Sequence, residues 1–162
     1  MRKLLLGVMA AALLAGPVAA WAGPGVLELS AGSGFLLEGE NDRIPTNLML
    51  TGGLDVLDTV KLELGVVYNL DDVEGSKSEV DLRPMVVVAP PLFPLYLRGI
   101  VGVTGLKEGP TAMNYGGALG WRLGALGLGV FIEAGAMTRK VDTATGDDTL
   151  WIGEGRIGGY WD

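Results

Sequence analysis

The 162-residue chain contains neither cysteine nor histidine. Without cysteine it has no disulfide framework, no thiolate metal site and no cysteine for an N-terminal lipid anchor. Without histidine it lacks the side chain that most often acts as the general base for a hydroxyl nucleophile. Basic residues are also few, 12 against 19 acidic ones, which gives a net charge of −7. Because phosphate binding needs clustered lysine and arginine, we expect no nucleic acid partner.

Only one long apolar run is present, and it lies at the N-terminus. The run Leu4–Leu14 follows two basic residues, and Ala20-Trp21-Ala22 has the small-x-small pattern of a cleavage site. The run is too short for a membrane anchor, which needs about 20 apolar residues. We therefore expect a signal peptide over residues 1–22 and one domain over residues 23–162. Cleavage would remove two of the 12 basic and none of the 19 acidic residues, which takes the net charge from −7 to −9.

The rest of the chain has no helical period but alternates between apolar and polar residues. It carries frequent valine and leucine, and turn residues recur at short, regular intervals, as in a protein made of many strands. Each predicted strand has at least the 9–11 residues that a tilted strand needs to cross a bilayer. The eight predicted strands are Gly25–Glu38, Thr46–Val56, Thr59–Leu70, Val80–Ala89, Leu95–Leu106, Asn114–Gly124, Gly127–Arg139 and Thr149–Trp161.

The connections between the predicted strands alternate in length, and the longer ones are polar. The short ones are Leu57-Asp58, Pro90–Pro94 and Ala125-Leu126; the longer ones are Gly39–Pro45, Asp71–Glu79, Lys107–Met113 and Lys140–Asp148. Outer-membrane barrels have short turns on the periplasmic side and long loops outside the cell. The sequence therefore predicts an all-β fold, a closed antiparallel up-and-down barrel of eight transmembrane strands.

The charges within the predicted strands lie on one face. Successive side chains of a strand point to opposite faces, and strands with two internal charges carry both at the same parity, as with Lys61 and Glu63. The other parity is apolar and free of charge. A charged interior and an apolar exterior are typical of a membrane barrel. The alternative is a secreted soluble barrel of the lipocalin kind, which would bury the apolar face around an apolar ligand.

Aromatic residues on the apolar parity gather near both ends of the strands. Aromatic side chains suit the two membrane interfaces, whereas a soluble core gives no reason for such a distribution, so the membrane barrel is favoured. The predicted interface aromatics are Phe35, Tyr68, Tyr115 and Trp151 near the long loops, and Trp121 and Trp161 near the short turns.

The interior of an eight-stranded barrel is just wide enough for its own side chains. Inward charges removed from water need partners, and we interpret them as a structural salt-bridge network that plugs the lumen. The alternative is a minor pore for small ions or solutes. The network is predicted to comprise Glu63, Arg83, Arg98, Arg122, Glu133, Glu154 and Arg156.

The end of the chain, Ile157-Gly158-Gly159-Tyr160-Trp161, resembles the aromatic-terminated last strand by which outer-membrane proteins are recognised for assembly, although Asp162 follows the aromatic residue here. In overall plan, from Gly25 to Trp161, the chain resembles the small eight-stranded outer-membrane barrels, such as the transmembrane domain of OmpA or OmpX. The resemblance implies residence in the outer membrane of a Gram-negative envelope. It also implies an encounter with the outer-membrane assembly machinery through the last strand.

No catalytic, cofactor-binding or metal-binding residues are predicted. Some eight-stranded outer-membrane barrels modify lipid A with a histidine and a serine, but this chain has no histidine. The glycine pair of Gly32-Ser33-Gly34 is not followed by a helical pattern, so a dinucleotide site is not indicated.

The expected function is therefore non-enzymatic, with a structural, envelope-stabilising or surface-recognition role through acidic outer loops. Loops on a rigid scaffold often carry recognition. Their acidic clusters could also bridge divalent cations to lipopolysaccharide phosphates, although no ligand loop of defined spacing is present. Membrane lipid and lipopolysaccharide are the expected partners, and we expect a monomer. The acidic loop residues are Glu38, Glu40, Asp42, Asp71, Asp72, Glu74, Asp142, Asp147 and Asp148.

Overall fold

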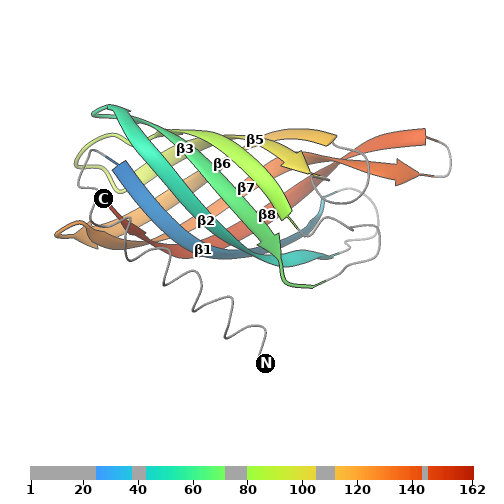
Figure 1. The fold of residues 1–162 in the computed structure, drawn as a ribbon, viewed down its shortest axis with the longest axis horizontal. Coiled ribbons are helices and arrows are strands. Elements are labelled where there is room, and N and C mark those ends of the chain that lie inside the picture. Colours follow the sequence, from blue (N-terminus) through green and yellow to red (C-terminus); the bar gives the residue numbers. More distant parts are fainter. Residues whose placement is uncertain (1–24, 38–42, 72–79, 105–111, 144–145) are drawn as a thin grey trace.

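The computed structural model describes residues 25–37, 43–71, 80–104, 112–143 and 146–162. These residues form one closed antiparallel barrel in which each strand pairs with its neighbours in chain order and β1 closes against β8 (Figure 1). The predicted all-β, eight-stranded fold is confirmed, and the expected signal peptide lies outside the described residues. The strands are β1 (Gly25–Leu36), β2 (Arg43–Leu57), β3 (Val60–Asn69), β4 (Val80–Val88), β5 (Leu95–Thr104), β6 (Ala112–Ala125), β7 (Leu128–Thr143) and β8 (Gly146–Trp161).

Short turns join β2 to β3, β4 to β5 and β6 to β7 at one end of the barrel, on the left in Figure 1. The turn between β6 and β7 is a two-residue hairpin closed by the pair Ala125–Leu128. Its central residues, Leu126 and Gly127, both have positive φ, at 56° and 77°. This combination is that of a type I′ turn, whose twist matches that of the strands it joins. We call this end of the barrel the short-turn end and the opposite one the long-loop end.

The predicted loop Lys140–Asp148 was wrong in its extent. Pairing between β7 and β8 continues through Asp142–Asp147 to Thr143–Gly146, so that only residues 144–145 connect the two strands. The hairpin projects beyond the other strands at the long-loop end (Figure 1). Polar residues on both parities had favoured a loop. A paired strand whose residues do not alternate between apolar and polar gives no such signal in the sequence.

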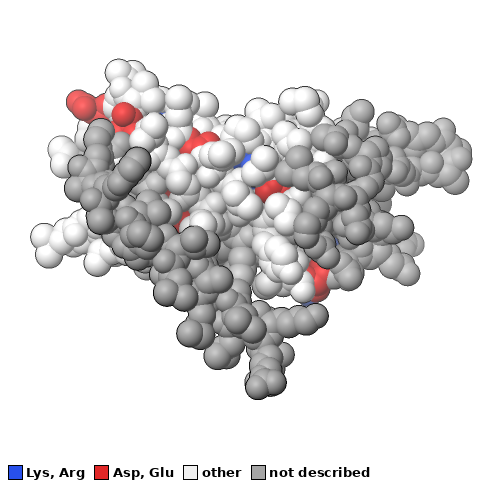
Figure 2. Space-filling model, in the orientation of Figure 1, with Lys and Arg blue, Asp and Glu red and all other residues white. Residues whose placement is uncertain are grey.

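The alternation of β3 shows how the wall of the barrel is built. Lys61 and Glu63 are buried in the interior, and their neighbours Leu62 and Leu64 are exposed on the outside. The other strands follow the same rule, and Figure 2 shows that most of the described outer surface in this view carries neither acidic nor basic residues. Among the described residues, no helix is long and apolar enough to cross a membrane.

Two apolar clusters fill parts of the interior. The first lies towards the short-turn end and consists of Val26, Val87, Ala89, Tyr96, Phe131 and Tyr160. The second reaches from the middle of the barrel to the long-loop end and consists of Ile44, Met49, Val67, Met85, Ile100, Ala118, Met137 and Ile152. Charged side chains occupy the space that these clusters leave.

Gly120 on β6 makes room for the ring of Tyr96 on the paired strand β5. The two residues face each other in the register, and a Cβ atom on Gly120 would lie only 2.0 Å from Cζ of Tyr96. The ring cannot easily move aside, because it packs edge-to-face on Phe131 at 6.5 Å and its hydroxyl donates to Glu133. Glycine is therefore required here by a close approach and not by backbone conformation.

We predict that Gly120→Ala lowers the free energy of unfolding by about 1–3 kcal/mol, the usual cost of overpacking a closed interior. Urea unfolding of the barrel in lipid vesicles, followed by tryptophan fluorescence, measures this. The matched control is Gly155→Ala, because a Cβ on Gly155 meets nothing within 4 Å. Equal unfolding midpoints for the two variants would contradict the packing argument.

Candidate functional site: a charged network in the barrel interior

Arg98 on β5 lies at the centre of three carboxylates that come from three other strands. Its Nη2 donates to Oε2 of Glu28 at 2.7 Å and lies 3.1 Å from Oε2 of Glu63. Its Nη1 lies 3.0 Å from Oε2 of Glu133. All four side chains are buried, and the side chain of Arg98 is only 1% exposed. One positive charge thus joins β1, β3, β5 and β7 across the lumen, and we call these four residues the Arg98 cluster.

Aromatic rings hold the guanidinium of Arg98 in place. Its Cζ lies 5.4 Å from the ring centre of Tyr96 and 5.8 Å from that of Phe131, which is within the range of cation–π attraction. Tyr96 also donates its hydroxyl to Oε2 of Glu133 at 2.9 Å. The rings belong to the apolar cluster at the short-turn end, so the Arg98 cluster lies directly against an apolar layer.

In the Arg98 cluster the opposite charges lie close together, but several of the polar atoms lack an aligned hydrogen bond. Among the described residues, Nε and Nη1 of Arg98 and Oε2 of Glu63 have no aligned hydrogen-bond partner, although Nη1 and Oε2 both lie within ion-pair distance of opposite charges. Coulomb attraction depends on the distance between the charges and not on the N–H direction, so these contacts attract without an aligned hydrogen bond. The cluster is therefore held by the attraction of opposite charges rather than by bidentate arginine–carboxylate hydrogen bonds.

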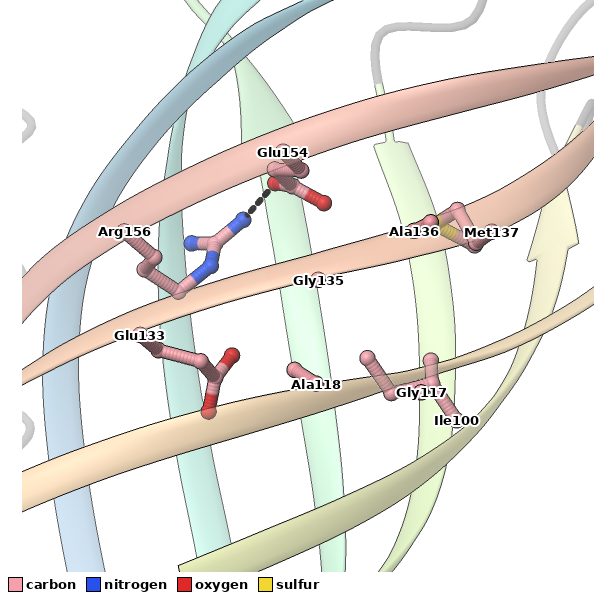
Figure 3. A pocket seen from close by; sticks show the side chains of 9 residues that line it. All are labelled: Ile100, Gly117, Ala118, Glu133, Gly135, Ala136, Met137, Glu154 and Arg156. Carbon is pink, nitrogen blue, oxygen red and sulfur yellow. Dashed lines mark hydrogen bonds and ion pairs between the residues drawn. The ribbon is translucent and has the colours of Figure 1, made fainter. Parts of the chain in front are cut away.

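A second group of charges, the Glu154 cluster, lies further towards the long-loop end. The carboxylate of Glu154 accepts a hydrogen bond from Nη1 of Arg83 at 2.7 Å and another from Nη2 of Arg156. Figure 3 shows Arg156 and Glu154 of β8 facing each other beside Glu133 of β7. Arg156 also donates to Oδ1 of Asn47 at 2.6 Å and to the hydroxyl of Ser30 at 3.2 Å. This cluster holds two positive charges and one negative charge.

The structure distributes the seven predicted network residues over three places. Arg98, Glu63 and Glu133 belong to the Arg98 cluster, whereas Arg83, Glu154 and Arg156 belong to the Glu154 cluster. Arg122 joins neither, since within the described residues it forms no ion pair. Its guanidinium lies over the ring of Tyr160, with Cζ 5.9 Å from the ring centre. Arg122 lies four residues before Leu126 of the turn between β6 and β7, at the short-turn end.

Several residues of the site were not in the predicted network. Glu28 and Tyr96 are full members of the Arg98 cluster, and Asn47 and Ser30 are hydrogen-bonded to Arg156. The parity rule carried a signal for Tyr96, because it lies two residues from Arg98 and therefore on the same face. The same rule placed Asn47 on the inner face of β2, but its contact with Arg156 depends on β2 and β8 both flanking β1, where Gly32 pairs with both residues.

Two small cavities lie among the described side chains of the lumen. A cavity of about 10 Å³ lies between the two clusters, where Glu133, Glu154 and Arg156 meet Ile100 and Ala118. A second cavity of about 40 Å³ lies nearer the long-loop end, beside Asn47, Arg83 and Asn114. A single water needs roughly 10–15 Å³ of such volume, so the cavities have the size of one or a few waters.

The six predicted interface aromatics all lie on the outer wall. Each is exposed, from 41% for Trp121, Trp151 and Trp161 to 62% for Tyr115. Trp121 pairs with Leu95 at the start of β5, and Trp161 pairs with Leu27 and Leu128, so both are near the short-turn end. Phe35, Tyr68, Tyr115 and Trp151 are near the long-loop end.

One predicted loop residue, Asp71, has a structural role at the rim of the long-loop end. Its carboxylate forms an ion pair with Arg43 and accepts a hydrogen bond from the backbone N–H of Thr46 at 2.6 Å. It thereby ties the end of β3 to the start of β2. Over the part of the chain that the structure describes, no group of three or more acidic residues is arranged to hold a metal ion.

Comparisons with known proteins bear on the fold. No protein-family model matches the chain, and no curated protein matches it. The crystal structure of Neisserial surface protein A (NspA) is similar, with 10% identity, coverage of 86% of this chain and 97% of that chain, and a TM-score of 0.57. The solution NMR structure of the de novo designed TMB2.3 has 12% identity, covers 87% and 96%, and has a TM-score of 0.50.

The N-terminal β-barrel domain of Pseudomonas aeruginosa OprF is also matched, with 14% identity, coverage of 85% and 98%, and a TM-score of 0.49. Identities this low show the fold alone. The chain has the fold of the small eight-stranded outer-membrane barrels, the plan that its sequence resembles.

We predict that Arg98→Met lowers the free energy of unfolding by about 3–5 kcal/mol, because it leaves three carboxylates buried without a cation. The control is Arg43→Met, which breaks the ion pair with Asp71 at a position where the arginine side chain is 60% exposed. An exposed pair contributes less than about 1 kcal/mol. Urea unfolding in vesicles measures both, and similar losses in the two variants would contradict the charge-centred interior.

Proposed function

We propose that this chain is a non-enzymatic barrel of the bacterial outer membrane whose interior is a structural plug. Its role would be to stabilise the envelope or to support recognition by the loops at the long-loop end. The observation that carries the proposal is the inversion of a soluble protein's pattern. Arg98 and its three carboxylates are buried inside, while leucine, valine and aromatic side chains cover the outside.

The outer wall supports a lipid environment. Exposed apolar side chains occur on all eight strands, including Leu62, Leu97, Leu119 and Ile157. A monomer in water rarely exposes apolar patches larger than a few hundred Å², whereas a bilayer requires such a wall. A lipocalin-like barrel needs the reverse arrangement. The described interior instead holds charge pairs and packed apolar side chains, with cavities of only about 10 and 40 Å³ beside them.

The packed lumen supports a plug more than a pore. The two clusters bridge the interior from β1, β3, β4, β5, β7 and β8, and the cavities beside them have the size of one or a few waters. An ion crossing the lumen would have to displace Arg98 from its carboxylates. Separating a buried charge from its partners is costly, because both are left without water. We therefore keep the minor pore as a second candidate only.

The partners follow from the same arrangement. Membrane lipid would contact the wall, and lipopolysaccharide would contact the acidic loops, most of whose residues lie outside the described part of the chain or have side chains that are not described. The last strand would engage the outer-membrane assembly machinery, since β8 ends on the exposed aromatic Trp161. Catalysis is not part of the proposal, because the chain has no histidine to activate a hydroxyl nucleophile.

We expect the expressed chain to fractionate with outer membranes and to need detergent for extraction. On unheated gels the folded barrel should migrate differently from the boiled chain, because the closed hydrogen-bonded sheet resists detergent below its unfolding temperature. A chain that stays soluble without detergent would overturn the membrane proposal and favour the lipocalin-like alternative.

Planar-bilayer recordings should show no conductance above that of the empty bilayer, because the Arg98 and Glu154 clusters close the lumen. Glu133→Ala, which removes one carboxylate from the lumen, serves as the comparison. Discrete current steps in the unmodified chain that change in size with Glu133→Ala would establish the pore in place of the plug.

A further inference from the structure

Two of the short turns place a leucine at the tip in a backbone conformation that leucine rarely adopts. Leu92, between β4 and β5, has a φ of 66°, and Leu126, between β6 and β7, has a φ of 56°. In this left-handed region the Cβ of an ordinary residue crowds the backbone. Both side chains are also completely exposed. We call them the turn-tip leucines.

A turn in water would not be expected to carry these residues. Glycine, asparagine and aspartate are the usual residues at positive φ in turns, and Asn-Gly is typical of a two-residue type I′ hairpin. This chain has Leu126-Gly127 at that place. In water, leucine at this position would cost free energy for two reasons: the backbone is strained, and the apolar side chain is exposed. Residues in strained backbone conformations are often found at functional positions.

The turn-tip leucines continue the apolar wall of the barrel. Leu128, two residues after Leu126, is exposed on the outside and pairs with the interface aromatic Trp161. Two residues of a strand span about 7 Å, so the tip lies close to the level of an aromatic side chain that suits the membrane interface. At the other turn, Leu92 is followed by the exposed Phe93.

Charged side chains at the short-turn end of the barrel make it unfavourable for another protein to cover the turn-tip leucines. Nζ of Lys61 lies 3.2 Å from Oδ1 of Asp55 and 3.9 Å from Oδ2 of Asp162, and both carboxylates are about one-third exposed. A protein that covered the tips from below would also remove these charges from water, which is costly. Lipid surrounds a barrel from the side and leaves its mouth in contact with water.

We propose that the turn-tip leucines are lipid anchors that insert into the boundary between headgroups and acyl chains on the short-turn side of the membrane. This inference rests on the proposed function as a membrane barrel and adds the depth at which that barrel lies. The turns that carry Leu92 and Leu126 are then part of the membrane-embedded surface, and the strained leucines fix the depth of the barrel in the membrane.

Single-cysteine labelling tests the depth, because the chain has no cysteine of its own. Leu92→Cys and Leu126→Cys are expressed in a Gram-negative host, purified from its outer membrane, labelled with an environment-sensitive fluorophore and reconstituted in phosphatidylethanolamine–phosphatidylglycerol vesicles. We expect lipids with brominated acyl chains to quench both labels. Iodide on both sides of the membrane should quench them much less than it quenches the same labelled chain unfolded in urea.

A label at Leu119, on the apolar wall between Leu97 and Ala134, separates the two proposals. If Leu119 is protected from iodide while both tips are quenched as in the unfolded chain, the anchor inference is overturned and the membrane barrel stands. If Leu119 is quenched as well, the membrane proposal itself has failed. Protection at all three positions supports both.

A second test needs no label: it measures whether a substitution at Leu126 raises or lowers the stability of the barrel in vesicles. Leu126→Asn places a residue that tolerates positive φ at the tip. If the tip lies in water, the substitution relieves strain and raises the urea midpoint in vesicles. We expect the midpoint to fall, because the variant loses its contact with lipid. Asp58→Asn, in the exposed turn between β2 and β3, is the control and should leave the midpoint unchanged. A raised midpoint for Leu126→Asn would overturn the proposal.

Discussion

The pairing of backbone hydrogen bonds around a closed sheet is the constraint on which the rest of this structure depends. In hydrocarbon an unpaired N–H or C=O group is costly, and a sheet avoids edges only by closing on itself. Here β1 closes against β8 over ten residue pairs, from Leu27–Trp161 to Leu36–Ile152. Closure with eight strands then sets the width of the interior, which is just enough for side chains to fill.

That narrow interior explains the form of the charged network. Charges placed inside cannot be hydrated by bulk water, so they are stabilised by opposite charges close by. Arg98 serves three carboxylates, and Glu154 serves two arginines. Apolar layers next to the clusters, such as Tyr96 and Phe131, lower the local dielectric and strengthen the attraction. The charged network thus follows from the narrow interior that closure of the barrel creates.

The outer surface follows the opposite rule and extends further than the strands alone. Apolar side chains continue from the wall into two of the short turns, where Leu92 and Leu126 adopt strained backbone conformations. At the other end, β7 and β8 remain paired beyond the rest of the barrel. The two ends therefore differ in kind: one continues the apolar wall and the other extends into polar segments.

The sequence by itself determined the number of strands, their approximate bounds and the face to which each side chain points. These are local properties, because alternation with a period of two is written into each segment and is strong wherever one face is apolar. It failed at Lys140–Asp148, where both faces are polar and alternation carries no information. Only the tertiary structure decided which charges meet. Arg98 reaches Glu28, Glu63 and Glu133, while Arg122 lies over Tyr160. Those pairings depend on strand register and on the stagger at closure, which bring together side chains far apart in the sequence, such as Ser30 and Arg156, 126 positions apart.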